Sequence, residues 1–148
     1  MSKFYEIEPN LENYWRSIIL FGRNVASYKF ALARAMYDLK DSGDTVITLD
    51  KLAIPFVKHI THHLVLCNKQ GTSASSQFLN ACRDFNAEKL SYNELIDLTV
   101  KVGFNNVIDA FHNVHNAEIP TRFFIDERKT KGGIILTDAF FKKTNNCR

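Results

Sequence analysis

The 148-residue chain has the length of a single domain, and a domain of about 150 residues buries roughly 70% of the surface that its unfolded chain exposes. A hydrophobic content of 45% with 24% charged residues argues against disorder, and a net charge of +3 is too small to indicate a nucleic-acid binder. No apolar run reaches the roughly 18 residues of a membrane span, and the N-terminus lacks a signal-peptide pattern, so we expect a cytoplasmic protein with no membrane partner.

The first predicted element is a long helical segment capped by Asn10 and interrupted at Gly22, where a bend or a close helix contact is expected. Its apolar residues recur with heptad spacing, which predicts a face that packs into the core. The alternative is an interaction face for dimerisation, formed by Tyr14, Phe21 and Tyr28. The stripe comprises Leu11, Ile18, Val25, Leu32 and Leu39, with Tyr14, Phe21, Tyr28 and Ala35 between them, and a second row of Trp15, Ile19 and Phe30 widens the buried face.

Four more helices are expected in the middle of the chain, each delimited by capping residues or glycine. The first starts near Thr48 or Asp50, continues to Lys69 and stops at Gly71. The others are predicted at Gln77–Phe85, at Tyr92–Val102 with Ser91 as the cap, and at Asn106–Val114.

The period of the apolar residues changes after Ile119. Short apolar runs at Thr121–Ile125 and Gly133–Leu136 flank a charged segment, which predicts a β-hairpin. Thr137 can then cap a last helix through Phe141, and residues 144–148 are expected to be a frayed tail. The predicted fold is a mainly α, multi-helix single domain over residues 1–148, with an ordered core at 9–143 and a small C-terminal β-hairpin.

Three residues at helical spacing are weak candidates for a metal site. His59, His63 and Cys67 are separated by four residues each and would share one face of a helix, but the glutamate of a His-Glu-x-x-His motif is missing. We therefore predict no metal and no cofactor, with histidines that bond to neighbouring elements. Cys67 and Cys82 lie in apolar patterns and are expected to be inert reduced thiols.

The C-terminal part of the chain carries the excess positive charge, with seven basic residues against three acidic ones from Pro120 onward. The cations lie near Phe123 and Phe124, and cations beside aromatic rings suit phosphate contact and base stacking. A charged hairpin tip that is simply solvated is the alternative. The candidate nucleic-acid-binding residues are Arg122, Arg128, Lys129, Lys131, Lys142 and Lys143.

Five strings of the sequence are considered together: Tyr14–Ala33, Lys69–Ser73, Gly103–Phe111, Pro120–Arg128 and Leu136–Asp138. They resemble the N-terminal helical region of bacterial HNH-endonuclease-type proteins, in which that region precedes a nuclease module. The resemblance extends from about residue 10 to residue 140.

The catalytic part of the HNH pattern is missing. An HNH module needs a histidine pair or Asp-His with a downstream Asn and His, and His62-His63 has no such context. The resemblance therefore implies a non-catalytic accessory or regulatory domain of a defence-like nuclease system, which engages DNA, a nuclease module or another partner protein. The alternative hypothesis is a protein-interaction or dimerisation module with no nucleic-acid role. In the dimerisation form of this hypothesis, two copies of the chain form a homodimer.

Overall fold

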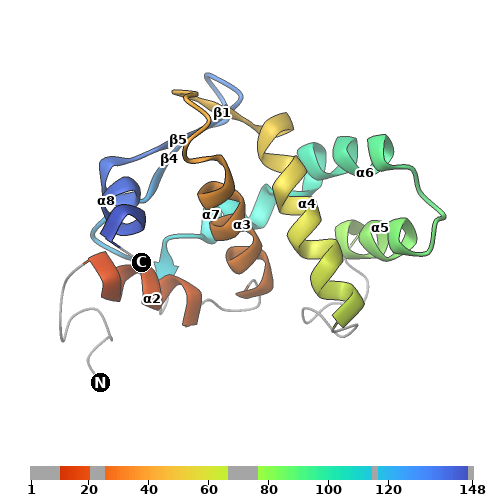
Figure 1. Cartoon of the computed structure of the whole chain (residues 1–148), viewed down its shortest axis with the longest axis horizontal. Coiled ribbons are helices and arrows are strands. Elements are labelled where there is room, and N and C mark those ends of the chain that lie inside the picture. Colours follow the sequence, from red (N-terminus) through yellow and green to blue (C-terminus); the bar gives the residue numbers. More distant parts are fainter. Residues whose placement is uncertain (1–10, 21–25, 67–76, 115–116, 147–148) are drawn as a thin grey trace.

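The computed structural model describes residues 11–20, 26–66, 77–114 and 117–146. These residues form a mainly helical structure with a few short antiparallel strands, mostly near the C-terminus, which confirms the predicted mainly α class with a C-terminal hairpin (Figure 1). The helices are α2 (Leu11–Leu20), α3 (Ala26–Leu39), α4 (Leu49–Leu66), α5 (Gln77–Asn86), α6 (Tyr92–Leu98), the π-helix η1 (Thr99–Gly103), α7 (Asn105–Ala110) and α8 (Asp138–Asn146). The strands are β1 (Ile47–Thr48), β2 (Asn113–Val114), β3 (Ala117–Glu118), β4 (Phe124–Glu127) and β5 (Gly133–Leu136).

Helix α4 lies at the centre of the molecule, with α3 on one side and α5 and α6 on the other (Figure 1). Its buried face repeats every fourth residue, which is the spacing of one side of an α-helix. Thr48 caps it as predicted, since the Thr48 hydroxyl accepts a hydrogen bond from the Lys51 N–H at 3.4 Å. The residues of α4 with this spacing are Leu52, Phe56, Ile60 and Leu64, all fully or almost fully buried.

The heptad segment forms two helices in the described residues, because α2 ends at Leu20 and α3 begins at Ala26. The predicted interruption at Gly22 and the stripe residues Phe21 and Val25 lie outside the described part of the chain. Ile18 and Leu32 are fully buried, so these stripe residues belong to the hydrophobic core.

The predicted hairpin forms between β4 and β5, and a strand that the sequence did not reveal completes its sheet in the order β1-β5-β4. Thr48 of β1 pairs with Gly133 of β5, and Ile47 pairs with Ile134. A Cβ atom on Gly133 would lie 2.0 Å from the Ile47 carbonyl oxygen. Only glycine therefore allows β1 to approach β5 without a backbone shift.

One predicted helix ends earlier than expected, and another changes its type along its length. The helix predicted at Asn106–Val114 stops at Ala110, since Asn113 and Val114 form β2 and pair with β3. The helix predicted at Tyr92–Val102 is α-helical only to Leu98 and continues as the π-helix η1, where the Thr99 hydroxyl donates to the Leu95 carbonyl at 2.7 Å. Ser91 caps α6 as predicted, in a reciprocal capping box with Glu94.

The last helix is longer than predicted, because α8 continues from Asp138 to Asn146 rather than ending at Phe141. The hydroxyl of Thr144 donates back to the carbonyls of Phe140 and Phe141 at 3.1 and 3.2 Å. Residues 144–146 are thus helical and not the frayed tail that we expected. Across the described residues, no helix has the length and apolar character to cross a membrane.

Candidate binding groove

A cavity of about 540 Å³ is lined by residues of α2, α3 and α8. Helices α2 and α8 lie on the side of the molecule away from α5 and α6 (Figure 1). The surface of the cavity is predominantly apolar and the cavity opens to solvent, so we call it the α2–α3–α8 groove. Its size falls in the range of small-ligand sites, which is about 300 to 1,000 Å³. The groove is lined by Trp15, Arg16 and Ile19 of α2, by Phe30, Ala33, Arg34 and Tyr37 of α3, and by Phe140, Lys143 and Thr144 of α8.

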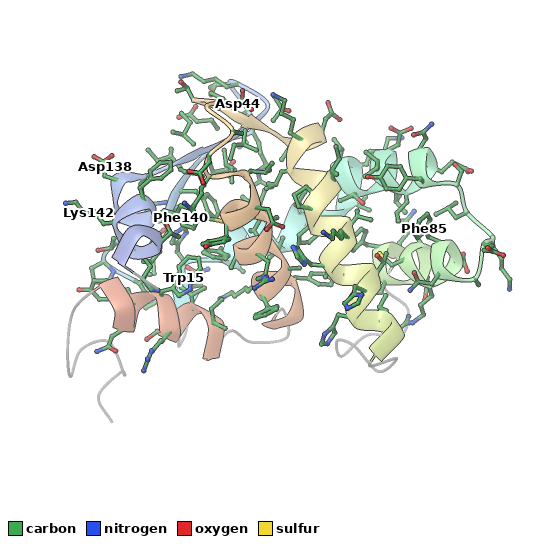
Figure 2. All side chains as sticks on the ribbon, viewed as in Figure 1. Trp15, Asp44, Phe85, Asp138, Phe140 and Lys142 are labelled. Atoms are coloured by element: carbon green, nitrogen blue, oxygen red, sulfur yellow. The ribbon has the colours of Figure 1, made fainter. Side chains whose placement is uncertain are left out.

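Two aromatic side chains from opposite ends of the chain meet in the lining of the groove (Figure 2). The ring centroids of Trp15 and Phe140 are 5.8 Å apart, and Trp15 also packs edge-on against Phe111 and Phe123 at 5.9 and 5.0 Å. Phe140 is fully buried. The indole is therefore held in place by three phenylalanine rings, which gives the groove a preformed aromatic surface.

Helix α3 presents two half-exposed aromatic rings and a cation to the groove. Phe30 is 52% exposed and Tyr37 is 51% exposed, with the exposed Arg34 between them. Residues spaced i, i+4 and i+7 lie on one face of a helix. The prediction that Phe30 belongs to the buried face was wrong, because this side of α3 faces the cavity instead of another helix.

The charged residues that line the groove are all basic. Arg16, Arg34 and Lys143 contribute to it, and none of the ten lining residues in the described part of the chain is acidic. Asp38, which follows Tyr37 on α3, instead bonds to His59 Nε2 at 2.7 Å. A cavity with low-dielectric walls and charges of one sign attracts ligands of the opposite charge.

The two arginines of the predicted DNA-binding hairpin are occupied by carboxylates. Arg128 contacts the carboxylate of Asp126 at 2.7 and 2.8 Å and that of Asp109 at 2.5 Å. These bonds hold the pKa of Asp126 below its ordinary value, with the hydrogen bond from Arg128 as the largest cause. Arg122 bonds to Glu118 and to the Phe124 carbonyl.

The other four predicted nucleic-acid contacts are distributed over two places. Lys129 and Lys131 are exposed in the turn of the β4–β5 hairpin. On α8, Lys142 points away from the molecule (Figure 2), whereas Lys143 is 8% exposed and lines the groove. The structure therefore does not bring the six predicted cations together in one patch, and it places one of them in the groove.

The weak candidates for metal ligands do not form a cluster in the described residues. His59 is bonded to Asp38 from the neighbouring helix α3, as in the non-metal interpretation, and His63 is exposed. Cys67 lies outside the described residues. No group of three or more potential ligands occurs among the residues with described positions.

The described tyrosines of the predicted interaction face are engaged within the chain. Tyr28 packs edge-to-face on Phe56 and Phe78 at 6.4 and 5.8 Å, and Tyr14 is partly buried against the core. Phe21 lies outside the described residues. The arrangement of Tyr14 and Tyr28 thus favours the core-packing interpretation of the stripe.

Cys82 on α5 is fully buried within the hydrophobic core. Burial raises the pKa of its thiol to about 12, with a small opposing effect of Arg83. A protonated, inaccessible thiol is a poor nucleophile. This environment agrees with the expected inert thiol.

The buried position of His112 was not predicted from the sequence. His112 Nε2 accepts a hydrogen bond from the Phe123 N–H at 2.8 Å, so the neutral ring carries its proton on Nδ1, which has no partner among the described residues. Burial, followed by the charges of Arg122 and Lys29, lowers the pKa of His112 to about 3. Lys29 is itself buried and donates to the Asn113 carbonyl at 2.9 Å, and burial lowers its pKa to about 8.

Comparison of the chain with protein-family models, with curated proteins and with solved structures gave no match. The resemblance to HNH-type proteins stays a prediction from the sequence strings.

Proposed function

We propose that the chain is a non-catalytic accessory domain of a bacterial HNH-type nuclease system, acting in the cytoplasm, and that it engages DNA through the α2–α3–α8 groove. The observation that carries the proposal is the lining of the groove, which combines aromatic rings with basic side chains and has no carboxylate among the described residues. Proteins that bind nucleic acid combine a positive groove that follows the phosphates with aromatic surfaces that contact the bases. The resemblance in the sequence supplies the nuclease context.

This proposal moves the principal DNA contact from the hairpin to the groove. Arg122 and Arg128 already satisfy carboxylates, and breaking those bonds would offset the gain from a phosphate contact. The exposed Lys129, Lys131 and Lys142 stay available as peripheral phosphate contacts. Such contacts strengthen binding without sequence preference.

The test is DNA binding by the purified chain across a salt series, with single- and double-stranded oligonucleotides. Affinity should fall steeply with salt, because bound phosphates release counterions. Arg34→Glu should weaken binding and reduce the salt slope by about one for the lost phosphate contact. Lys101→Glu is the matched control, since Lys101 is exposed on η1 outside the groove and the substitution changes the net charge equally.

The second candidate function is a protein-interaction or dimerisation module, which the half-exposed rings of Phe30 and Tyr37 favour. It predicts a mass that rises with concentration in sedimentation and a Phe30→Ala variant that stays monomeric. If the chain does not bind DNA at low salt and its mass rises with concentration, the interaction or dimerisation function replaces the DNA-binding function.

A further inference from the structure

We propose that the α2–α3–α8 groove receives an unpaired base of single-stranded nucleic acid, while Arg34 holds the adjoining phosphate. This inference rests on the proposed function and names its substrate class. It follows from three features of the groove: its volume, the order of side chains on α3, and the apolar character of its walls.

The cavity has the volume for a whole base, and its apolar walls favour an unpaired base over a paired one. A volume of about 540 Å³ lies between three helices, with Trp15 and Phe140 in its lining. In a duplex, the flat faces of the bases are covered by their neighbours, so the outer surface offers phosphates and groove edges only. A mainly apolar hollow gains free energy from the exposed face of an unpaired base.

The face of α3 matches the alternation of base and phosphate along one strand. Phe30, Arg34 and Tyr37 place a ring, a guanidinium group and a second ring along the mouth of the groove. An arginine between two stacking surfaces can bond a phosphate while the neighbouring bases contact the rings. The Lys40 ammonium lies 5.5 Å from the centroid of the Tyr37 ring, but it is paired with the Asp41 carboxylate at 3.2 Å, so Arg34 is the cation of this face that we assign to the phosphate.

The groove contains its own spectroscopic probe. Trp15 is the one tryptophan of the 148-residue chain, and it lines the cavity. A base that enters the groove therefore changes the fluorescence of a single, assigned residue. Charge attraction elsewhere on the protein leaves that signal unaltered.

The experiment is a titration of the full chain with an oligothymidylate, with a duplex, and with an oligonucleotide of abasic sites, all of equal strand length. We expect the oligothymidylate to quench Trp15 at saturation. The duplex and the abasic strand should bind at least about tenfold more weakly and leave Trp15 fluorescence unchanged, because loss of one base–aromatic contact corresponds to about a tenfold change in affinity. Poly-glutamate is the acidic-polymer control and should not quench.

Two alanine variants provide the matched comparison. Phe30→Ala should weaken oligothymidylate binding about tenfold through loss of a stacking surface. Ile54→Ala removes a side chain of similar exposure, 53%, on α4 outside the groove lining, and should leave binding unchanged. Both side chains are half-exposed, so we expect both variants to fold. The circular dichroism of each variant checks that a difference in oligothymidylate binding is not caused by unfolding.

Three outcomes overturn the inference and separate it from the proposed function. Equal affinity for duplex and abasic DNA with unchanged Trp15 fluorescence disproves base entry but keeps DNA binding. Quenching by poly-glutamate to the same extent assigns the groove to an acidic polypeptide. No binding of any nucleic acid at low salt removes both the inference and the proposed function.

Discussion

Replacing His112 by glutamine should leave stability near neutral pH almost unchanged and remove much of the loss of stability in acid. The side chain is 1% exposed, and its Nε2 accepts the Phe123 N–H at 2.8 Å. A glutamine oxygen can occupy nearly the same position as Nε2 and keep this bond. Glutamine does not titrate, so the two proteins differ chiefly in how they respond to protons.

The direction and size of this loss of stability in acid follow from the pKa values of His112 in the folded and unfolded states. Folded His112 stays neutral down to about pH 3, whereas the unfolded side chain takes up a proton near its ordinary pKa of 6.5. The unfolded state binds the extra proton between these values, so the free energy of unfolding falls as the pH falls through this window. At pH 4.5 the titration of His112 therefore lowers the free energy of unfolding by about 3 kcal/mol relative to neutral pH.

Urea unfolding of both proteins at pH 7.5 and pH 4.5 measures this difference. The low pKa of Asp126 adds its own acid sensitivity, but both proteins share it. His112→Phe is a further control that leaves the Phe123 N–H without an acceptor, and it should cost about 1 to 3 kcal/mol at pH 7.5. An equal loss of stability in acid for wild type and His112→Gln would refute the reasoning.

The remaining predictions concern the buried lysine, the sheet and the hairpin turn. Lys29 releases its proton near pH 8 when folded but near 10.5 when unfolded, so unfolding free energy should rise by about 2 kcal/mol between pH 7.5 and pH 9.5. Lys29→Met should lack this rise in urea titrations. Gly133→Ala should cost about 1 to 3 kcal/mol in thermal unfolding, since its Cβ would meet the Ile47 carbonyl; an unchanged melting temperature would contradict this contact. Reversing Lys129 and Lys131 to glutamate should reduce the salt slope of DNA binding by at most about two while Trp15 quenching persists, and loss of the quenching would place the base site at the hairpin.

Local sequence signals predicted the elements whose stabilising contacts are local. Ser91 caps α6 in a capping box with Glu94, and Thr48 caps α4 from the position just before the helix, so both signals lie within a few residues of the helix start. The charged segment between two apolar runs located the β4–β5 hairpin for the same reason. Each of these signals lies inside a short window of the chain.

Features that depend on distant partners could not be predicted. Strand β1 has two residues, and its pairing with β5 depends on Gly133, far along the chain. The ion pair between Arg128 and Asp109 neutralises a cation that local composition presents as available for phosphate. The groove could not be predicted either, because its lining comes from three helices that are far apart in the sequence. The helical pattern of α3 alone does not show whether Phe30 faces another helix or a cavity.

The contact between Trp15 and Phe140 has a consequence for protein synthesis. One half of this aromatic pair leaves the ribosome early, on α2, and the other half leaves late, on α8. The central helices can pack during translation, since domains begin to fold as they emerge. The groove, however, acquires its third wall only when α8 has been made, so a nascent chain carries α2 and α3 before the cavity between the three helices is complete.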